Sequence, residues 1–359
     1  MKTIKIFISA VAIIFAISCV PQHNYRMVTK LNRDGKAHRD IYTFGDSAFM
    51  SGNISENPFL FDISSNWNIT RFDTSMNYDF FGEKIEYNVK ISKSASSIEQ
   101  YSKEANYDKD KKSFAAPEEL LTKKFGLFYT RYYFKAVYKK LEYEVPVSID
   151  NYLSKEEQII WTQGNTDIYK TLNGCEINDY LNRINGKFLE WSSQNQFEIS
   201  LKCIKKLTTE YDLDANKENI YELIDIEKEI SPEIVCSALG SFFKTDYFSK
   251  LYQAKKEILD KDFEYAIPLN LMGITISYEL EIPVSPDNKT VKTNAQIIDW
   301  KGVLIWKVDG MRLLFDDYSL NAEYKVLNKW AVFITLLLLF IAVSNIIVLV
   351  RKKGCCHAK

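Results

Sequence analysis

Two apolar runs bracket this chain, and regular patterns of polar and apolar residues fill the space between them. The first run, Ile6–Ile17, follows Lys2 and Lys5. It is shorter than the roughly 20 residues that cross a bilayer. An apolar run of this length after a positive start predicts a secretory signal peptide over residues 1–18.

The second run, Trp330–Val350, carries no charge over 21 residues. That length spans a hydrocarbon core, and Trp330 suits the membrane interface, so we predict one transmembrane helix over 330–350. The alternative, a buried helix of a soluble domain, is disfavoured by so long an uncharged run. Arg351, Lys352 and Lys353 follow it. The positive-inside bias then predicts a cytoplasmic tail over 351–359 and an extracytoplasmic domain over 19–329.

Alternating apolar and polar residues predict strands near both ends of this domain. A hairpin is expected where Tyr25–Asn32 and Ala37–Phe44 flank an Asp-Gly turn. Lys84–Ser92, Ile274–Ile282 and Tyr318–Val326 alternate with a period of two. The last of these strands leads almost directly into the membrane run.

Between these strands the period becomes that of a helix. Apolar residues from Ile177 to Trp191 recur on one helical face, and further helices are expected at about 197–210, 217–228 and 232–260. Strands, then helices, then strands predict an α+β fold. We expect a mostly antiparallel sheet built from both ends of the domain, with a helical block inserted at about 170–260.

The segment Phe125–Tyr143 holds eight aromatic residues, which fall on both faces of any strand drawn through it. One interpretation is one or two strands buried on both sides. The other is an exposed surface on which a sugar or peptide stacks. The first is favoured, because the segment lacks tryptophan and has little glycine.

Composition and charge narrow the possible partners. Lys and Arg total 46 against 47 Asp and Glu, and no basic stripe stands out, so we expect no nucleic-acid binding. Aromatic residues make up 14% of the chain, which is typical of an ordered protein. Cys175, Cys203 and Cys236 lie in the domain. One disulfide among them is open, and their spacing does not choose it.

The signal run ends in Ala16-Ile17-Ser18-Cys19. Small residues directly before a cysteine resemble a bacterial lipobox, and the resemblance implies that Cys19 becomes the lipidated first residue. Ala16 departs from the leucine that is usual at its position. The alternative is an ordinary signal peptide cut near Ser18.

The overall layout also resembles that of bacterial lipoproteins with a C-terminal membrane helix, the LppM-like lipoproteins among them. The matching features are Cys19, the turn at Asn32–Lys36 and a final strand that leads into Trp330. They cover the layout and both ends of the chain. The resemblance implies a cell-envelope location and no activity.

One stretch of the chain resembles a catalytic motif. Phe44-Gly45-Asp46-Ser47 resembles the first block of the GDSL esterases, in which the serine is the nucleophile. A serine nucleophile needs a general base, which that family supplies from an Asp-x-x-His block near the end of the domain. Such a block is absent here. The only histidines are His23, His38 and His357, so no catalytic residue is assigned.

Metal and cofactor motifs are not convincing either. Asp212, Asp214, Asn216 and Glu218 resemble the start of a calcium loop. An EF-hand needs glycine at its sixth position and glutamate at its twelfth, where this chain has Lys217 and Leu223. We therefore predict a polar helix connection there, and no metal or cofactor site.

The sequence thus predicts a single-pass protein of the plasma (inner) membrane. We expect a noncatalytic binding or scaffolding role, with the lipid bilayer and an envelope protein as partners. The alternative is an envelope enzyme with a site of dispersed carboxylates and tyrosines, which motif analysis does not detect. A GDSL-like hydrolase is the least favoured.

Overall fold

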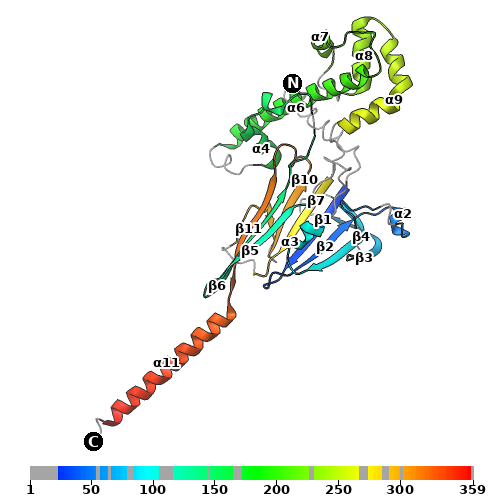
Figure 1. Ribbon diagram of the computed structural model, residues 1–359. Helices are drawn as coiled ribbons and strands as arrows, with labels where there is room; N and C mark the ends of the chain where they lie inside the picture. Colours follow the sequence, from blue (N-terminus) through cyan, green and yellow to red (C-terminus); the bar gives the residue numbers. More distant parts are fainter. Residues whose placement is uncertain are drawn as a thin grey trace.

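A strand-rich body lies between a block of helices and one long C-terminal helix (Figure 1). The computed structural model describes residues 23–356, apart from 54–56, 64–65, 79–83, 105–115, 144, 165–171, 226–229, 267–273, 285–290 and 300–301. The predicted signal peptide and Cys19 lie outside the described residues.

The larger sheet has seven strands in the order β3-β4-β2-β1-β7-β10-β9. Their bounds are β1 His23–Leu31, β2 Ala37–Thr43, β3 Asn68–Tyr78, β4 Lys84–Ala95, β7 Ile274–Glu281, β9 Ile297–Ile298 and β10 Val303–Asp309. Neighbours are antiparallel except β1 and β7, which run parallel. A parallel pair needs a long crossover, and here the crossover contains the helical block.

The smaller sheet has four strands in the order β5-β6-β11-β8. They are β5 Glu118–Lys124, β6 Tyr129–Tyr138, β8 Lys292–Thr293 and β11 Tyr318–Leu327, all paired antiparallel. The central pair, β6 and β11, stays in register over ten residue pairs from Tyr129–Leu327 to Tyr138–Tyr318.

The two sheets share one apolar core. Tyr278 and Trp306 are fully buried in the larger sheet, and both rings lie about 6 Å from that of Phe134 in the smaller sheet. Within the smaller sheet, the rings of Tyr132 and Tyr324 stack with centroids 5.0 Å apart. Because each sheet buries one face against the other, the strands form a sandwich.

The α+β class and the mostly antiparallel sheet strands from both ends of the domain are confirmed, as are the strands expected at 25–32, 37–44, 84–92, 274–282 and 318–326. The strands make two sheets instead of the single sheet expected. The apolar face of the larger sheet needs a cover, and the second sheet supplies it.

The segment Phe125–Tyr143 corrects a second expectation. It contains only one face of buried aromatics, because β6 alternates between buried and exposed positions. Phe125, Leu127 and Phe128 precede the strand in an exposed loop. The interpretation as a strand buried on both sides is therefore wrong.

The helical block contains α4 Lys155–Gln163, α6 Gly174–Lys205, α7 Lys217–Tyr221, α8 Pro232–Phe243 and α9 Tyr247–Ala266. The helix expected from Ile177 and the one expected at about 197–210 form one helix, α6, of 32 residues. It starts with a capping box in which the Asn173 side chain accepts from the backbone of Glu176. The block also begins earlier than expected, with α4.

The helical block is fixed to one end of the sandwich. The ring of Phe315, in the loop between β10 and β11, lies 6.2 Å from that of Phe188 and 5.5 Å from that of Trp191 on α6. Arg312 donates to the carbonyl of Gln163 at 3.1 Å. We call this the block end of the sandwich. The opposite end, where Leu327 leads into the C-terminal helix, is the anchor end.

The two termini of the described chain leave the sandwich at opposite ends (Figure 1). The C-terminal helix, α11 Lys329–Cys356, starts at the anchor end. His23, the first residue of β1, lies at the block end. It is paired with Ile274, the first residue of β7, which follows the helical block, and the two strands run parallel. The turn after β1 lies toward the anchor end, where Tyr132 donates to the carbonyl of Arg33 at 2.6 Å.

Candidate functional site

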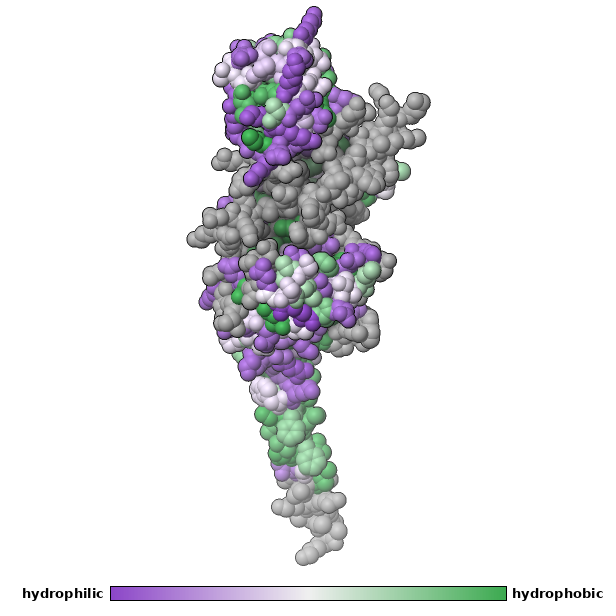
Figure 2. Space-filling view, turned by 90° about the vertical axis from the view of Figure 1, so that its right-hand side faces the viewer, coloured by the Kyte–Doolittle hydropathy of each residue, from purple (hydrophilic) through white to green (hydrophobic). Residues whose placement is uncertain are grey.

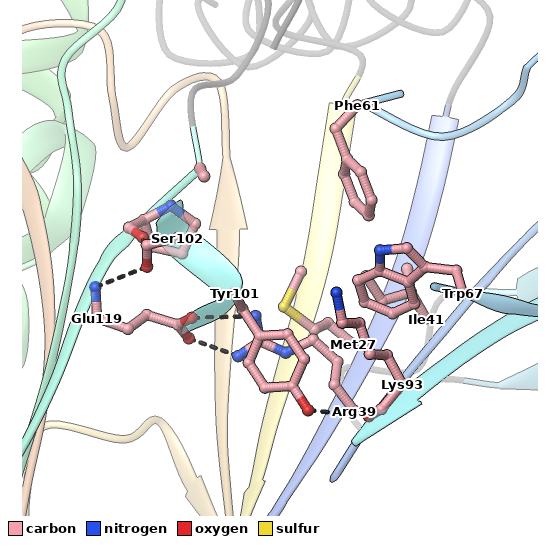
Figure 3. Close-up of a pocket in the computed structure, with 11 residues that line it drawn as sticks. Met27, Arg39, Ile41, Phe61, Trp67, Lys93, Tyr101, Ser102 and Glu119 are labelled. Carbon is pink, nitrogen blue, oxygen red and sulfur yellow. Dashed lines mark hydrogen bonds and ion pairs between the residues drawn. The ribbon is translucent and has the colours of Figure 1, made fainter. Parts of the chain in front are cut away.

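A small pocket opens between the two sheets beside α3 Glu99–Glu104 (Figure 3). Aromatic side chains and a buried ion pair line it. The lining includes Met27, Arg39, Phe61, Trp67, Tyr101 and Glu119. Its volume of about 20 Å³ is that of one or two ordered waters, which is far below a substrate cavity.

The ion pair joins the two sheets. The guanidinium of Arg39 on β2 donates to the Glu119 carboxylate on β5 at 2.6 and 3.0 Å. Arg39 also donates to Thr29 Oγ1 at 2.9 Å and to the Tyr278 hydroxyl at 3.1 Å. The Tyr278 hydroxyl donates to Glu119 at 2.5 Å. The Tyr101 ring lies 4.3 Å from the guanidinium.

Both members of this ion pair are almost completely buried. The side chains of Arg39 and Glu119 are 4% and 1% exposed. Burial by itself would lower the pKa of Arg39, but the adjacent Glu119 carboxylate outweighs it and raises that pKa. Burial, together with the same carboxylate, raises the pKa of Tyr278 well above its usual range. Arg39 therefore stays charged and Tyr278 stays a neutral hydrogen-bond donor at any physiological pH.

The geometry leaves these groups little chemistry to perform. Both Glu119 oxygens accept hydrogen bonds from Arg39, and the guanidinium has partners on all three nitrogens. A general acid or base needs room for a reacting atom within hydrogen-bond reach. The arrangement is instead a fully paired clamp between β2 and β5. Neither residue was predicted as a site from the sequence, although each is a charge on the inward face of an alternating strand.

The Gly45-Asp46-Ser47 segment is structural in its described contacts. Asp46 caps the short helix α2 Ser47–Met50 by accepting from Phe49 N at 2.8 Å. Asn88 holds Gly45 through two backbone hydrogen bonds of 2.7 Å each.

His38 is too far from Ser47 to act as its general base. Its ring contacts Ser94 Oγ at 2.9 Å and the Asp40 carboxylate at 3.3 Å. It lies near the start of β2, whereas Ser47 follows the other end of that strand. A strand rises about 3.3 Å per residue, so β2 keeps the two side chains well beyond hydrogen-bond reach.

The residues that resemble a calcium loop have other partners. Asp214 pairs with Lys205, and Asp212 accepts from the backbone of Ala215 at 3.1 Å. In the part of the chain that the structure describes, no group of three or more His, Cys, Asp or Glu side chains is arranged to hold a metal ion. The segment connects α6 to α7.

Cys175, Cys203 and Cys236, the cysteines in the described part of the domain, are unpaired in the structure. Cys203 and Cys236 are buried in the core of the helical block, and Cys175 is exposed near the start of α6. Burial raises the pKa of Cys236 to about 12, so its thiol stays protonated and unreactive.

The strongest functional feature is α11. Its stretch Lys329–Ile347 is long and apolar enough to cross a membrane, and most of its side chains are exposed. Figure 2 shows its upper part as an apolar stem, drawn green, below hydrophilic side chains of the body, drawn purple. Among the described residues, no contact with the sandwich covers this apolar surface, which is consistent with a membrane span.

No protein-family model, no curated protein and no solved structure matches the chain.

Proposed function

We propose that this chain is a single-pass membrane protein whose α+β domain binds or scaffolds a partner without catalysis. The observation that carries the proposal is the joint between β11 and α11. Only Asn328 separates the last residue of the sheet from the first residue of the apolar helix. The sandwich is therefore held close to the bilayer, and the helical block projects away from it.

In the proposed orientation, α11 spans an envelope membrane and the domain lies on the side away from the cytoplasm. The cations Arg351, Lys352 and Lys353 directly after the span favour a cytoplasmic C-terminus. The signal-like run Ile6–Ile17 favours export of the other end. Cys19 is proposed as the site of lipidation.

A binding role is favoured over catalysis by the pocket between the sheets. Its charged groups are paired with one another, and its volume suits water. The alternative of an enzyme with dispersed carboxylates and tyrosines would need ionisable groups that converge on open space. Arg39, Glu119 and Tyr278 converge, but on each other.

Protease accessibility tests the anchoring and the orientation. In intact spheroplasts that carry a C-terminal epitope tag, added protease should remove the domain and leave the tagged tail protected. After detergent lysis the tag should be digested as well. Protection of the domain in intact spheroplasts would reverse the orientation, and release of the full chain by alkaline carbonate would show that α11 does not span.

Site-directed photocrosslinking in native membranes tests the binding role. A photoreactive residue is placed at Leu223 or Ile258, which are 55% and 51% exposed on the helical block. Met76, 63% exposed on the edge strand β3, is the matched control. A discrete protein adduct at a block site and none at Met76 supports a partner at the membrane-distal block. Equal, diffuse labelling at all three sites contradicts it.

A further inference from the structure

The loop between β5 and β6 presents an apolar tip beside the start of α11. We call residues 125–129 the hairpin tip. Phe125 is 86% exposed, Leu127 64%, Phe128 40% and Tyr129 52%. Four large apolar side chains within five residues form an exposed patch that a surface facing only water does not explain.

Asn328 fixes the hairpin tip at the level where α11 begins. Its side-chain amide donates to the carbonyls of Gly126 at 2.7 Å and Leu127 at 3.2 Å. Its backbone N–H donates to the carbonyl of Phe128 at 2.8 Å. Because Lys329 is the first residue of α11, these hydrogen bonds hold the hairpin tip beside the start of the apolar helix.

A row of cations lies directly behind the tip. Lys124 on β5 is opposite Arg131 on β6, and Arg131 is opposite Lys325 on β11. Directly opposed residues of antiparallel strands share a face, and like charges so placed repel. Among the described residues, no carboxylate forms an ion pair with any of the three. We call this set the cation row.

The order of these features matches a membrane interface. The apolar tip is farthest toward α11, and the Arg131–Lys325 pair of the cation row lies two register pairs beyond the Tyr129–Leu327 pair, on the same face of the sheet. Hydrophilic side chains gather just above the apolar stem (Figure 2). In a bilayer this sequence places apolar side chains at the boundary of the acyl chains and cations at the level of the phosphates.

We propose that the hairpin tip is a second membrane contact, which inserts into the bilayer beside α11 while the cation row binds anionic phospholipid headgroups. This rests on the proposed function, in which α11 spans the membrane. Two contacts on one rigid sheet would fix the tilt of the sandwich over the bilayer, which a single helix does not.

Lipid photocrosslinking tests the contact in the full chain reconstituted into liposomes of phosphatidylcholine and phosphatidylglycerol. Benzoylphenylalanine replaces Phe125, Leu127, Leu337 in α11, or Leu223 on the helical block. We expect lipid adducts at Phe125, Leu127 and Leu337, and only background at Leu223.

The span and control sites separate the two proposals. Adducts at Leu337 with only background at Phe125 and Leu127 would overturn the tip contact and leave the anchor intact. Adducts at the tip without any at Leu337 would overturn the anchor, and with it the proposal of a second contact beside a spanning α11. A second copy of the chain captured at Phe125 in place of lipid would make the tip a protein interface and contradict the proposal.

A charge series tests the lipid class. Lys124→Gln, Arg131→Gln and Lys325→Gln are combined in the Phe125 photoprobe chain. The ratio of phosphatidylglycerol to phosphatidylcholine among the adducts should fall at least about fivefold. A single cation near an anionic surface already contributes about a fivefold gain in binding to that surface. Lys135→Gln, on the same strand and four residues farther from the tip, should leave the ratio unchanged. An unchanged ratio in the triple variant would overturn the headgroup assignment.

Discussion

Arg39 and Glu119 lie 80 residues apart in the chain and form two hydrogen bonds, of 2.6 and 3.0 Å, between the two sheets. Each is inward-facing on its strand, in a core that is mostly apolar. Such a pair contributes little to stability relative to apolar residues of the same volume, but it is costly to break. It also favours one pairing of the sheets, because any shift would bury an unpaired charge.

Removal of one partner should therefore be more harmful than removal of both. Glu119→Leu leaves the Arg39 guanidinium buried without a counter-ion and should cost about 3–5 kcal/mol of unfolding free energy. The double variant Arg39→Met/Glu119→Leu should recover most of that loss. Urea unfolding of the full chain in detergent, followed by tryptophan fluorescence, measures both. Glu118→Gln, on the exposed face of the same strand, is the control and should stay within about 0.5 kcal/mol of the parent.

The serine that resembles an esterase nucleophile should be dispensable. Ser47→Ala and His38→Ala are each expected to leave ester hydrolysis by the purified protein at the level of the uncatalysed reaction, because the two side chains lie toward opposite ends of β2. Asp46→Ala should instead lower stability by about 1 kcal/mol through loss of the helix cap. Hydrolysis of a p-nitrophenyl ester that disappears with Ser47→Ala would restore the hydrolase hypothesis.

The cysteines should differ in reactivity according to burial. Cys175 should react with maleimide in the folded protein, whereas Cys203 and Cys236 should react only after unfolding. Peptide mapping by mass spectrometry resolves the three sites. A disulfide between Cys203 and Cys236 in protein from native membranes would contradict the free thiols.

The thiol of Cys236 also determines the direction in which the stability of the folded chain changes at alkaline pH. Burial raises its pKa from 9.0 to about 12, so between these values the folded chain keeps a proton that the unfolded chain loses. The contribution of this group is therefore complete below pH 9 and falls as the pH rises toward 12. Cys236→Ala should flatten this alkaline part of the stability curve.

The placement of His23 sets a condition on lipidation at Cys19. Four peptide units separate Cys19 from His23, and a fully extended chain covers at most about 14 Å over that interval. β1 separates His23 from the anchor end by nine residues, or about 30 Å. A lipid on Cys19 should therefore enter a bilayer other than the one that holds α11.

Vesicle tethering measures this directly. Lipidated full-length protein in one set of liposomes should bring protein-free liposomes close enough for energy transfer between dyes in the two membranes. Cys19→Ser should abolish the transfer and stay in the membrane fraction, because α11 still anchors it. If the lipidated protein fails to tether, the prediction is wrong. Either β1 then detaches from the sandwich, or the lipid inserts into the same bilayer as α11.

Sequence patterns predicted the elements that have one face in the core. Ile274–Ile282 and Tyr318–Val326 alternate because each strand has an apolar side and a side that tolerates polar residues. The pairing of sheets was not predictable, because the Arg39–Glu119 contact joins positions whose spacing carries no local signal. Phe125 and Leu127 were misassigned to a buried strand, since apolar residues that the fold leaves exposed look like core residues in a sequence.

β11 has a mechanical consequence. Phe315 is packed into the helical block, and the covalent chain then runs straight through β11 into Lys329. A pull applied to the block by a bound partner reaches the bilayer along covalent bonds, over a strut of about 33 Å. Where load spreads from β11 to β6, ten register pairs share it in shear, so the sandwich should carry tension without unzipping.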